Sequence, residues 1–224
     1  MSDNCVVIVA AGSGQRMNHT QPKQFIQIDG VPVIVHAIRA FIKFDVGIQV
    51  VIVLGNSHFK EWETIKRDYL SDITIRTTKG GPSRFQSVKK GLSLVKNAKY
   101  VAIHDAARPC IDPQIVRRTF EAAVRTGSGV PVVSLKDSIR SVTHDSSKAE
   151  RREDYVIVQT PQTFRLSLIE AAYDTVELTS FTDDASVYEH SGQEVTLVEG
   201  SYQNIKLTTP DDLLIAEAYI KKAL

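Results

Sequence analysis

The sequence predicts an α/β fold with a mostly parallel β-sheet and helices on both of its faces. Short apolar runs that do not alternate recur along the chain, and their richness in β-branched residues is typical of strands buried on both faces. Helical patterns lie between these runs, and strands that alternate with helices form βαβ units with right-handed crossovers. Ligands of such sheets gather outside the carboxyl ends of the strands, so the loops after the apolar runs are candidate functional segments.

Four apolar runs predict strands, and a further strand is expected directly before the glycine pair at positions 80 and 81. Five amphipathic patterns predict helices, and a sixth helix is expected to start within residues 181–192. Pro32 stands near the start of the first helix, and Asp112 and Pro113 are the expected N-cap and first residue of the third. The strand runs span 5–10, 50–54, 100–104 and 130–133, and the helical patterns span 32–44, 83–95, 112–126, 165–176 and 209–224.

The pattern changes after the last of these strand runs. Residues 134–158 are polar, dense in charge and alternating in places, and residues 143–154 look like an exposed turn. We expect a single domain over residues 1–224 from which residues 134–158 protrude as a β-hairpin arm. Because such an arm has little core of its own, a partner subunit is the expected surface that covers it; a disordered surface loop is the alternative.

Composition limits the function classes. The 224 residues are 42% hydrophobic and 24% charged with a net charge of +1, which is ordinary for a globular protein and argues against nucleic-acid or membrane partners. No apolar run approaches the roughly 18 residues of a membrane span, and the N-terminus does not read as a signal peptide, so we expect a cytoplasmic protein. Cys5 and Cys110 are expected to be reduced structural thiols, and His104 is expected to pack rather than to bind a metal.

The loop after the first strand predicts a phosphate site. Gly12 and Gly14 allow backbone amides to approach phosphate oxygens. No Gly-Lys-Ser/Thr follows, which excludes a Walker A loop, and Met17 stands where a dinucleotide-binding loop has its third glycine. The loop contains no acid but carries Arg16 and Lys23, a pair suited to holding a nucleoside triphosphate. A loop with two solvated cations is the alternative.

Three further segments carry candidate site residues. The turn that holds Ser87 has glycine amides and a hydroxyl that can read a base edge, although a plain tight turn also explains it. Asp105 follows the third apolar run, where an acid can hold a divalent cation or orient a ribose; a structural ion pair with Arg108 is the alternative. Lys206, expected within a short strand facing the cleft, can hold a second phosphate.

Seven segments together resemble one family, the 2-C-methyl-D-erythritol 4-phosphate cytidylyltransferases of the non-mevalonate isoprenoid pathway. They lie between residues 10 and 213 in the family's order and spacing, so the resemblance covers nearly the whole chain. It implies a Rossmann-like nucleotidyltransferase fold with a β-arm that builds a homodimer. The segments are AAGSGQRM, PKQ, GGPSRFQSV, HDAARP, QTPQTF, TDDAS and NIKLTTPDDL.

The resemblance also implies roles for the matching positions. Arg16 and Lys23 are implied as the catalytic cations that clamp the triphosphate of CTP, and Asp105 and Ala106 as positions beside the ribose; the reaction also implies a divalent cation such as Mg²⁺, for which Asp105 remains the candidate ligand. The implied CTP-binding positions are Ala10, Ala11, Gly12, Gly14, Gly81, Ser87, Asp105 and Ala106. The implied positions for the acceptor phosphate are Arg152, Lys206, Thr182 and Arg108. In the family the arm arginine comes from the other subunit, and Arg151 is the neighbouring alternative to Arg152. Position 82 varies among family members, so Pro82 is a mild departure from the family pattern.

The implied reaction transfers a cytidylyl group from CTP to 2-C-methyl-D-erythritol 4-phosphate. The acceptor phosphate is already ionised at neutral pH, so cations and Mg²⁺ are needed rather than a general base. A polyol-phosphate enzyme acting on ribitol 5-phosphate is the alternative within the class, and Ala-Ala-Gly in place of Ala-Gly-Gly in the first loop argues against it. A nucleotide-binding module without turnover is the alternative outside the class, and Met17 makes an NAD oxidoreductase a distant third.

Overall fold

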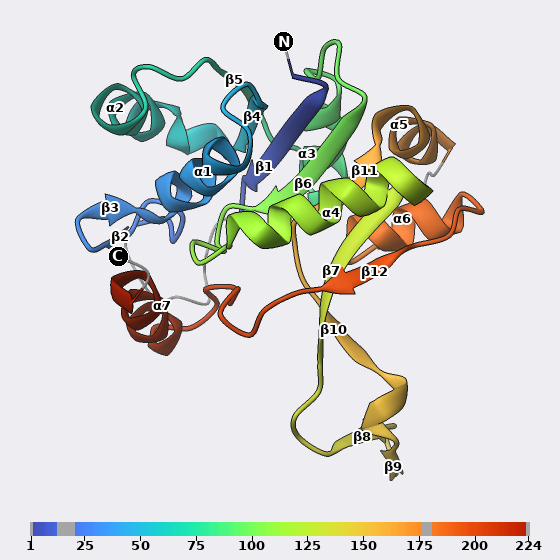
Figure 1. Ribbon diagram of the computed structural model, residues 1–224. Coiled ribbons are helices and arrows are strands. Elements are labelled where there is room, and N and C mark those ends of the chain that lie inside the picture. Colours follow the sequence, from blue (N-terminus) through green and yellow to red (C-terminus); the bar gives the residue numbers. More distant parts are fainter. Residues whose placement is uncertain (1, 13–20, 176–180, 223–224) are drawn as a thin grey trace.

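The structure is a computed structural model that describes residues 2–12, 21–175 and 181–222. Its centre is an eight-stranded sheet with the order β10-β7-β11-β6-β1-β4-β5, and β12 pairs with β7 (Figure 1). The strands of this sheet are β1 (Asn4–Ala10), β4 (Gln49–Leu54), β5 (Ile75–Lys79), β6 (Tyr100–Asp105), β7 (Ser128–Ser134), β10 (Val156–Val158), β11 (Gln162–Arg165) and β12 (Leu197–Glu199).

The middle of the sheet is parallel, as the apolar runs predict. β1 pairs in parallel with β4 on one side and with β6 on the other, and β5 continues the parallel order beyond β4. The antiparallel pairs lie beyond β6, where β11 runs against both β6 and β7, and β10 runs against β7. The predicted α/β class with a mostly parallel sheet is therefore confirmed.

Helices cover both faces of the sheet (Figure 1). Alternate residues of β1 therefore belong to two different cores. Val6 and Ile8 pack in the core that includes α1, α2 and α4, whereas Cys5 and Val7 pack in the core that includes α3, α5 and α6. The C-terminal helix α7 packs in a smaller cluster around Leu207. The helices are α1 (Val33–Phe44), α2 (Phe59–Tyr69), α3 (Arg84–Leu92), α4 (Pro113–Thr126), α5 (Leu166–Thr175), α6 (Asp184–His190) and α7 (Asp211–Lys222).

The predicted helices are all present, and the structure adds α2. The Asp112 carboxylate accepts the backbone N–H of Gln114 at the start of α4, which confirms the predicted cap. α2 is mostly polar and buries only Trp62 and Ile65, a stripe too narrow to produce a clear helical pattern in the sequence. No helix in the described ranges is both long and apolar enough to cross a membrane.

The segment after β7 leaves the sheet and extends away from the body (Figure 1). It forms a separate two-stranded hairpin of β8 (Ile139–Val142) and β9 (Ser147–Glu150), followed by the 3₁₀ turn η3 (Arg152–Asp154), and the chain then rejoins the central sheet as β10. The turn predicted over residues 143–154 is wrong in extent, because β9 and η3 lie inside that range. Hydrogen bonds between Thr143 and Ser146 close a much tighter turn, which lets the charged residues after it pair as a strand.

Candidate active site

A cleft of about 550 Å³ lies at the carboxyl ends of β1 and β6. This is the edge of the sheet at which α/β folds bind their ligands. Many of the predicted site residues meet there although they come from segments far apart in the chain. Those that line the cleft are Ala10, Ala11, Gly12, Lys23, Gly81, Ser87, Asp105, Ala106 and Lys206.

The first loop enters the cleft directly from β1. The buried Gln24 side chain donates from Nε2 to the carbonyl of Ala10 at 2.9 Å, which ties the PKQ segment to the end of the strand. Lys23 Nζ donates to the carbonyl of Leu207 at 2.7 Å, so this lysine reaches across the cleft to the C-terminal segment. Arg16 and Gly14 lie outside the described residues.

The turn before α3 forms another part of the cleft wall, beside the end of β1. The Ser83 hydroxyl caps α3 by accepting the N–H of Gln86 at 3.1 Å, and the buried Ser87 hydroxyl accepts the N–H of Gly81 at 3.0 Å. A Cβ atom on Gly81 would stand 2.5 Å from Cβ of Gln86, so the turn requires glycine there. Ser87 therefore holds the turn together as well as facing the cleft.

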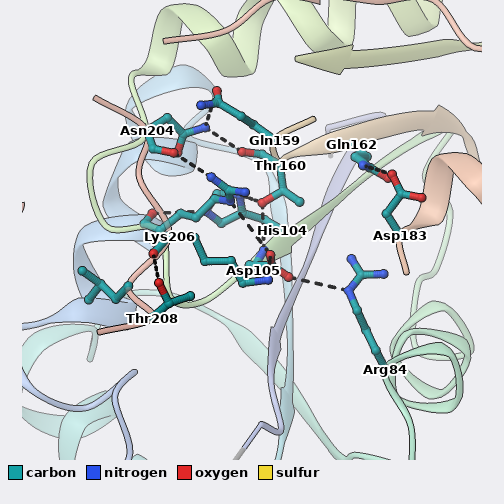
Figure 2. A network of polar contacts seen from close by, with 12 residues as sticks. Arg84, His104, Asp105, Gln159, Thr160, Gln162, Asp183, Asn204, Lys206 and Thr208 are labelled. Carbon is teal, nitrogen blue, oxygen red and sulfur yellow. Dashed lines mark hydrogen bonds and ion pairs between the residues drawn. The ribbon is translucent and has the colours of Figure 1, made fainter. Parts of the chain in front are cut away.

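Asp105 is surrounded by three cations (Figure 2). Its Oδ2 lies 2.7 Å from Nζ of Lys206, its Oδ1 lies 3.7 Å from Nε of Arg84, and Arg108 Nε is 3.9 Å from Oδ2. Burial alone would raise the pKa of Asp105, but Arg84, Lys206 and Arg108 lower that pKa well below its usual range. Asp105 is thus a stable carboxylate that holds positive side chains at the end of β6.

His104 behaves as the sequence predicts, as a packing residue. Its ring is fully buried, makes an edge contact with Phe41, and hydrogen-bonds the Thr160 hydroxyl and the Arg108 carbonyl. Burial lowers the pKa of His104 to about 4, although neighbouring Asp105 opposes the shift. The ring is neutral at neutral pH and does not line the cleft.

Sequence reasoning missed Arg84, which lines the cleft and connects it to α6. Its guanidinium makes two hydrogen bonds to the carboxylate of Asp184, at 2.9 and 2.6 Å, and the hydroxyl of Tyr173 donates to the same carboxylate. Asp184 is fully buried, whereas Asp183 caps α6 through the N–H of Ser186. Helix capping accounts for Asp183 alone. The sequence signal for a buried ion pair is the second acid, Asp184, together with the arginine in GGPSRFQSV.

The comparison with known proteins identifies the family. The profile described as 2-C-methyl-D-erythritol 4-phosphate cytidylyltransferase matches residues 4–222. The chain belongs to this cytidylyltransferase family. A protein of that name from Phocaeicola vulgatus is 41% identical over 215 residues, which cover 96% of this chain and 98% of the relative.

Solved structures of the family have the same fold. The 4-diphosphocytidyl-2C-methyl-D-erythritol synthase of Anaerococcus prevotii superposes with a TM-score of 0.84 at 25% identity, covering 98% of this chain and 99% of that chain. The 2-C-methyl-D-erythritol 4-phosphate cytidylyltransferase of Thermus thermophilus gives a TM-score of 0.78 at 29% identity, covering 96% and 98% of the two chains. The family resemblance drawn from the seven segments is confirmed.

Some positions implied by the family lie outside the cleft of this chain. Arg152 is on the arm, where it donates to the carbonyl of Lys136 at 2.7 Å, and Thr182 is exposed just before α6. Arg108 is buried behind the cleft wall and donates to the carbonyl of Asn204 at 2.7 Å. Lys206 lines the cleft but sits in an extended segment without strand pairing, so its predicted strand is wrong.

The residues around Asp105 fit a metal that arrives with a substrate. Within the described residues no three His, Cys, Asp or Glu side chains converge as a metal cage. Oδ1 of Asp105 lies 3.7 Å from Nε of Arg84, beyond hydrogen-bond distance, and the residue lines the cleft. Mg²⁺ is commonly bound by one or two carboxylates together with substrate phosphates, a pattern that a single carboxylate here can serve.

Proposed function

We propose that this protein transfers the cytidylyl group of CTP to 2-C-methyl-D-erythritol 4-phosphate, giving 4-diphosphocytidyl-2-C-methyl-D-erythritol and pyrophosphate for isoprenoid precursor synthesis. Membership of the family supports the class of reaction. The observation that carries the assignment is the cleft in which Lys23 and Lys206 lie with Asp105. Two anionic substrates repel each other, and a cleft lined with cations offsets that repulsion. We place the reaction in the cytoplasm, where CTP is made.

The nucleotide is proposed to lie between the loop after β1 and the turn before α3. Ala10, Ala11 and Gly12 line the cleft, and so do Gly81 and Ser87. Backbone amides of the glycine-rich loop suit phosphate oxygens, with Gly14 extending this loop. Asp105 and Ala106 at the end of β6 are proposed to face the ribose.

Arg16 and Lys23 are proposed to hold the triphosphate and to stabilise the charge that develops at the α-phosphorus. An oxygen of the acceptor phosphate forms the new bond to this phosphorus while the bond to the pyrophosphate oxygen breaks, and pyrophosphate leaves with that electron pair. No proton has to be removed from the nucleophile. The neutral, buried ring of His104 agrees with a mechanism that has no general base.

The acceptor phosphate is proposed to lie beside Lys206, with Thr182 and Arg108 near it and Arg152 reaching in from a second subunit. Lys206 Nζ now lies 2.7 Å from Oδ2 of Asp105 and its side chain is 38% exposed, so it can turn toward an incoming phosphate. Mg²⁺ is proposed to bind at Asp105 together with the phosphates of CTP, where its charge neutralises part of the triphosphate.

Pyrophosphate release from CTP tests the assignment. We expect release with 2-C-methyl-D-erythritol 4-phosphate, and a much slower rate with ribitol 5-phosphate at the same concentration. Faster release with ribitol 5-phosphate would assign a polyol-phosphate enzyme instead. Binding of CTP without release in the presence of either acceptor would leave only a nucleotide-binding module.

The arm is proposed to complete the site of a partner in a homodimer. Its support is the exposure of Arg152 in η3, next to a hairpin that extends away from the body of its own chain (Figure 1). Mixing an Arg152→Ala subunit with a Lys23→Ala subunit then places one intact site in each mixed dimer. We expect partial recovery of activity on mixing; mixed dimers that remain inactive would contradict a shared site.

A further inference from the structure

The segment that carries Lys206 is anchored without strand pairing. Residues 201–208 leave β12 and run past the end of β6 to α7, and their described backbone takes no place in any sheet. Lys206 and Thr208 nevertheless line the cleft. A segment outside the sheet needs other hydrogen-bond partners for its backbone and other contacts to hold it in place. These contacts determine where the Lys206 amine lies.

One anchor is the buried side chain of Asn204 (Figure 2). Its Nδ2 donates to the carbonyl of Thr160 at 2.9 Å and lies 3.3 Å from Oε1 of Gln159. Its own backbone carbonyl accepts from Arg108 at 2.7 Å. Asn204 thereby ties the segment to the end of β6 and to the chain that leads into β11.

The other anchor is Leu207. It is fully buried, its N–H donates to the carbonyl of Ala107 at 2.9 Å, and its carbonyl accepts from Lys23. Lys206 therefore stands between two fixed positions, two residues after Asn204 and directly before Leu207. Loss of the Asn204 anchor frees the side of the segment that leads into Lys206.

The geometry requires an amide at position 204. Both groups that Nδ2 faces, the Thr160 carbonyl and Oε1 of Gln159, are hydrogen-bond acceptors. A carboxylate of the same shape presents an acceptor to two acceptors. An apolar side chain takes the Nδ2 donor from the Thr160 carbonyl, whereas Oε1 of Gln159 keeps the N–H of Ser201 at 3.3 Å. Oδ1 of Asn204 has no partner in the described structure, so the donor side of the amide is what the fold uses.

We propose that Asn204 is a positioning residue for the acceptor phosphate, acting through Lys206. It touches no reacting atom; it holds the segment so that the Lys206 amine meets both Asp105 and the phosphate of the second substrate. This inference rests on the proposed function, in which Lys206 binds that phosphate. Displacement of a charged group by about 1 Å can cost on the order of 10²-fold in rate, so one anchor has a large effect on the site.

Steady-state kinetics of four variants test the inference. Asn204→Asp keeps the shape and removes the donor, Asn204→Ala removes the side chain, and Gln203→Ala changes its exposed neighbour as a control. For both Asn204 variants we expect KM for 2-C-methyl-D-erythritol 4-phosphate to rise about tenfold or more, while KM for CTP changes by less than about twofold. Gln203→Ala is expected to match the parent protein. Lys206→Ala is the fourth variant.

A change in KM for the acceptor without a matching change in KM for CTP separates a positioning role from a general loss of structure. An Asn204 variant with unchanged acceptor KM, or with equal losses for CTP and the acceptor, would overturn the inference. Calorimetric binding of 2-C-methyl-D-erythritol 4-phosphate in the presence of CTP without metal gives the same comparison for variants with little turnover.

Adding Lys206→Ala to the Asn204 variants tests the route of the effect. If Asn204 acts through Lys206, the double variant binds the acceptor no more weakly than Lys206→Ala alone; fully additive losses contradict the inference. The proposed function has its own readout, because Lys206→Ala alone should weaken the acceptor. If Lys206→Ala binds the acceptor as tightly as the parent protein, the proposed role of Lys206 and the inference both fail. If Lys206→Ala weakens acceptor binding but the Asn204 variants do not, only the inference fails.

Discussion

The central strands and the arm differ in what covers their side chains. In β1, β4 and β6 nearly every residue is buried, and alternate residues face two different cores. Nearly every residue of β8, β9 and β10 is exposed, with Ile157 in β10 at 49%. Body residues make their contacts within one chain, whereas the exposed side chains of these three strands have few such contacts. If a second subunit covers the arm as proposed, effects of arm changes should depend on protein concentration, and effects of body changes should not.

The largest effect on stability is expected at the buried ion pair of the body. Asp184→Ala removes the partner of Arg84 and of the Tyr173 hydroxyl in one step. We expect the free energy of unfolding to fall by about 3 kcal/mol. This is the low end for a broken buried ion pair, because the Arg84 side chain is 25% exposed and can reach water in the cleft. Denaturant unfolding measures it.

A surface acid provides the matched control for this prediction. Asp174→Ala breaks an exposed pair with Lys89 and is expected to cost less than about 1 kcal/mol. Similar losses for the two variants would show that the Arg84–Asp184 pair contributes no more than a surface pair. A loss that varies with protein concentration would show that the body is not independent of association.

Lys23→Ala is expected to lower turnover on the order of 10²–10³-fold, comparable with the loss of one oxyanion donor. The physical reason is the loss of a cation from the proposed triphosphate site. Lys90→Ala is the control, because Lys90 also donates to a backbone carbonyl, that of Gly80, but does not line the cleft. Pyrophosphate release at several enzyme concentrations should show the same fold loss throughout; equal activity of the two variants would contradict the role of Lys23.

The sequence predicts the body better than the arm for a physical reason. Strands buried on both faces leave apolar runs, and the residue after each run, such as Asp105, falls at the ligand-binding edge of the sheet. Asn204 and Arg84 lie outside these apolar runs and their partners, Thr160 and Asp184, are distant in sequence, so the pattern of runs does not predict their contacts. The sequence predicts a turn where β9 lies, because the side chains of β9 are mostly polar and leave no apolar run. Its only described strand partner is β8, which is also exposed.

Ile157→Ser tests the arm side of the comparison. Ile157 is half exposed on an edge strand, and we expect a second subunit to cover it. If each copy loses about 1 kcal/mol of apolar contact, the dimer Kd rises about thirtyfold, because a two-fold interface counts each substitution twice. Sedimentation across a dilution series measures the Kd. Val46→Ser is the control: Val46 is 86% exposed on the body, and its substitution is expected to leave the dimer Kd unchanged. An unaltered Kd for Ile157→Ser would remove β10 from the interface.

A pH dependence of stability is expected from the body alone. Burial lowers the pKa of His104 from its usual 6.5 to about 4, so between these values the unfolded chain binds a proton that the folded chain excludes. Stability should therefore fall as the pH falls through this window, by at most about 1.4 kcal/mol per pH unit from this residue. His104→Gln keeps an N–H that can reach the Arg108 carbonyl, which now bonds the ring, but cannot titrate, so its stability should change less with pH over that range. Denaturant unfolding in metal-free buffer from pH 7 to pH 4 compares the two slopes. Identical slopes would mean that His104 takes up its proton in the folded protein.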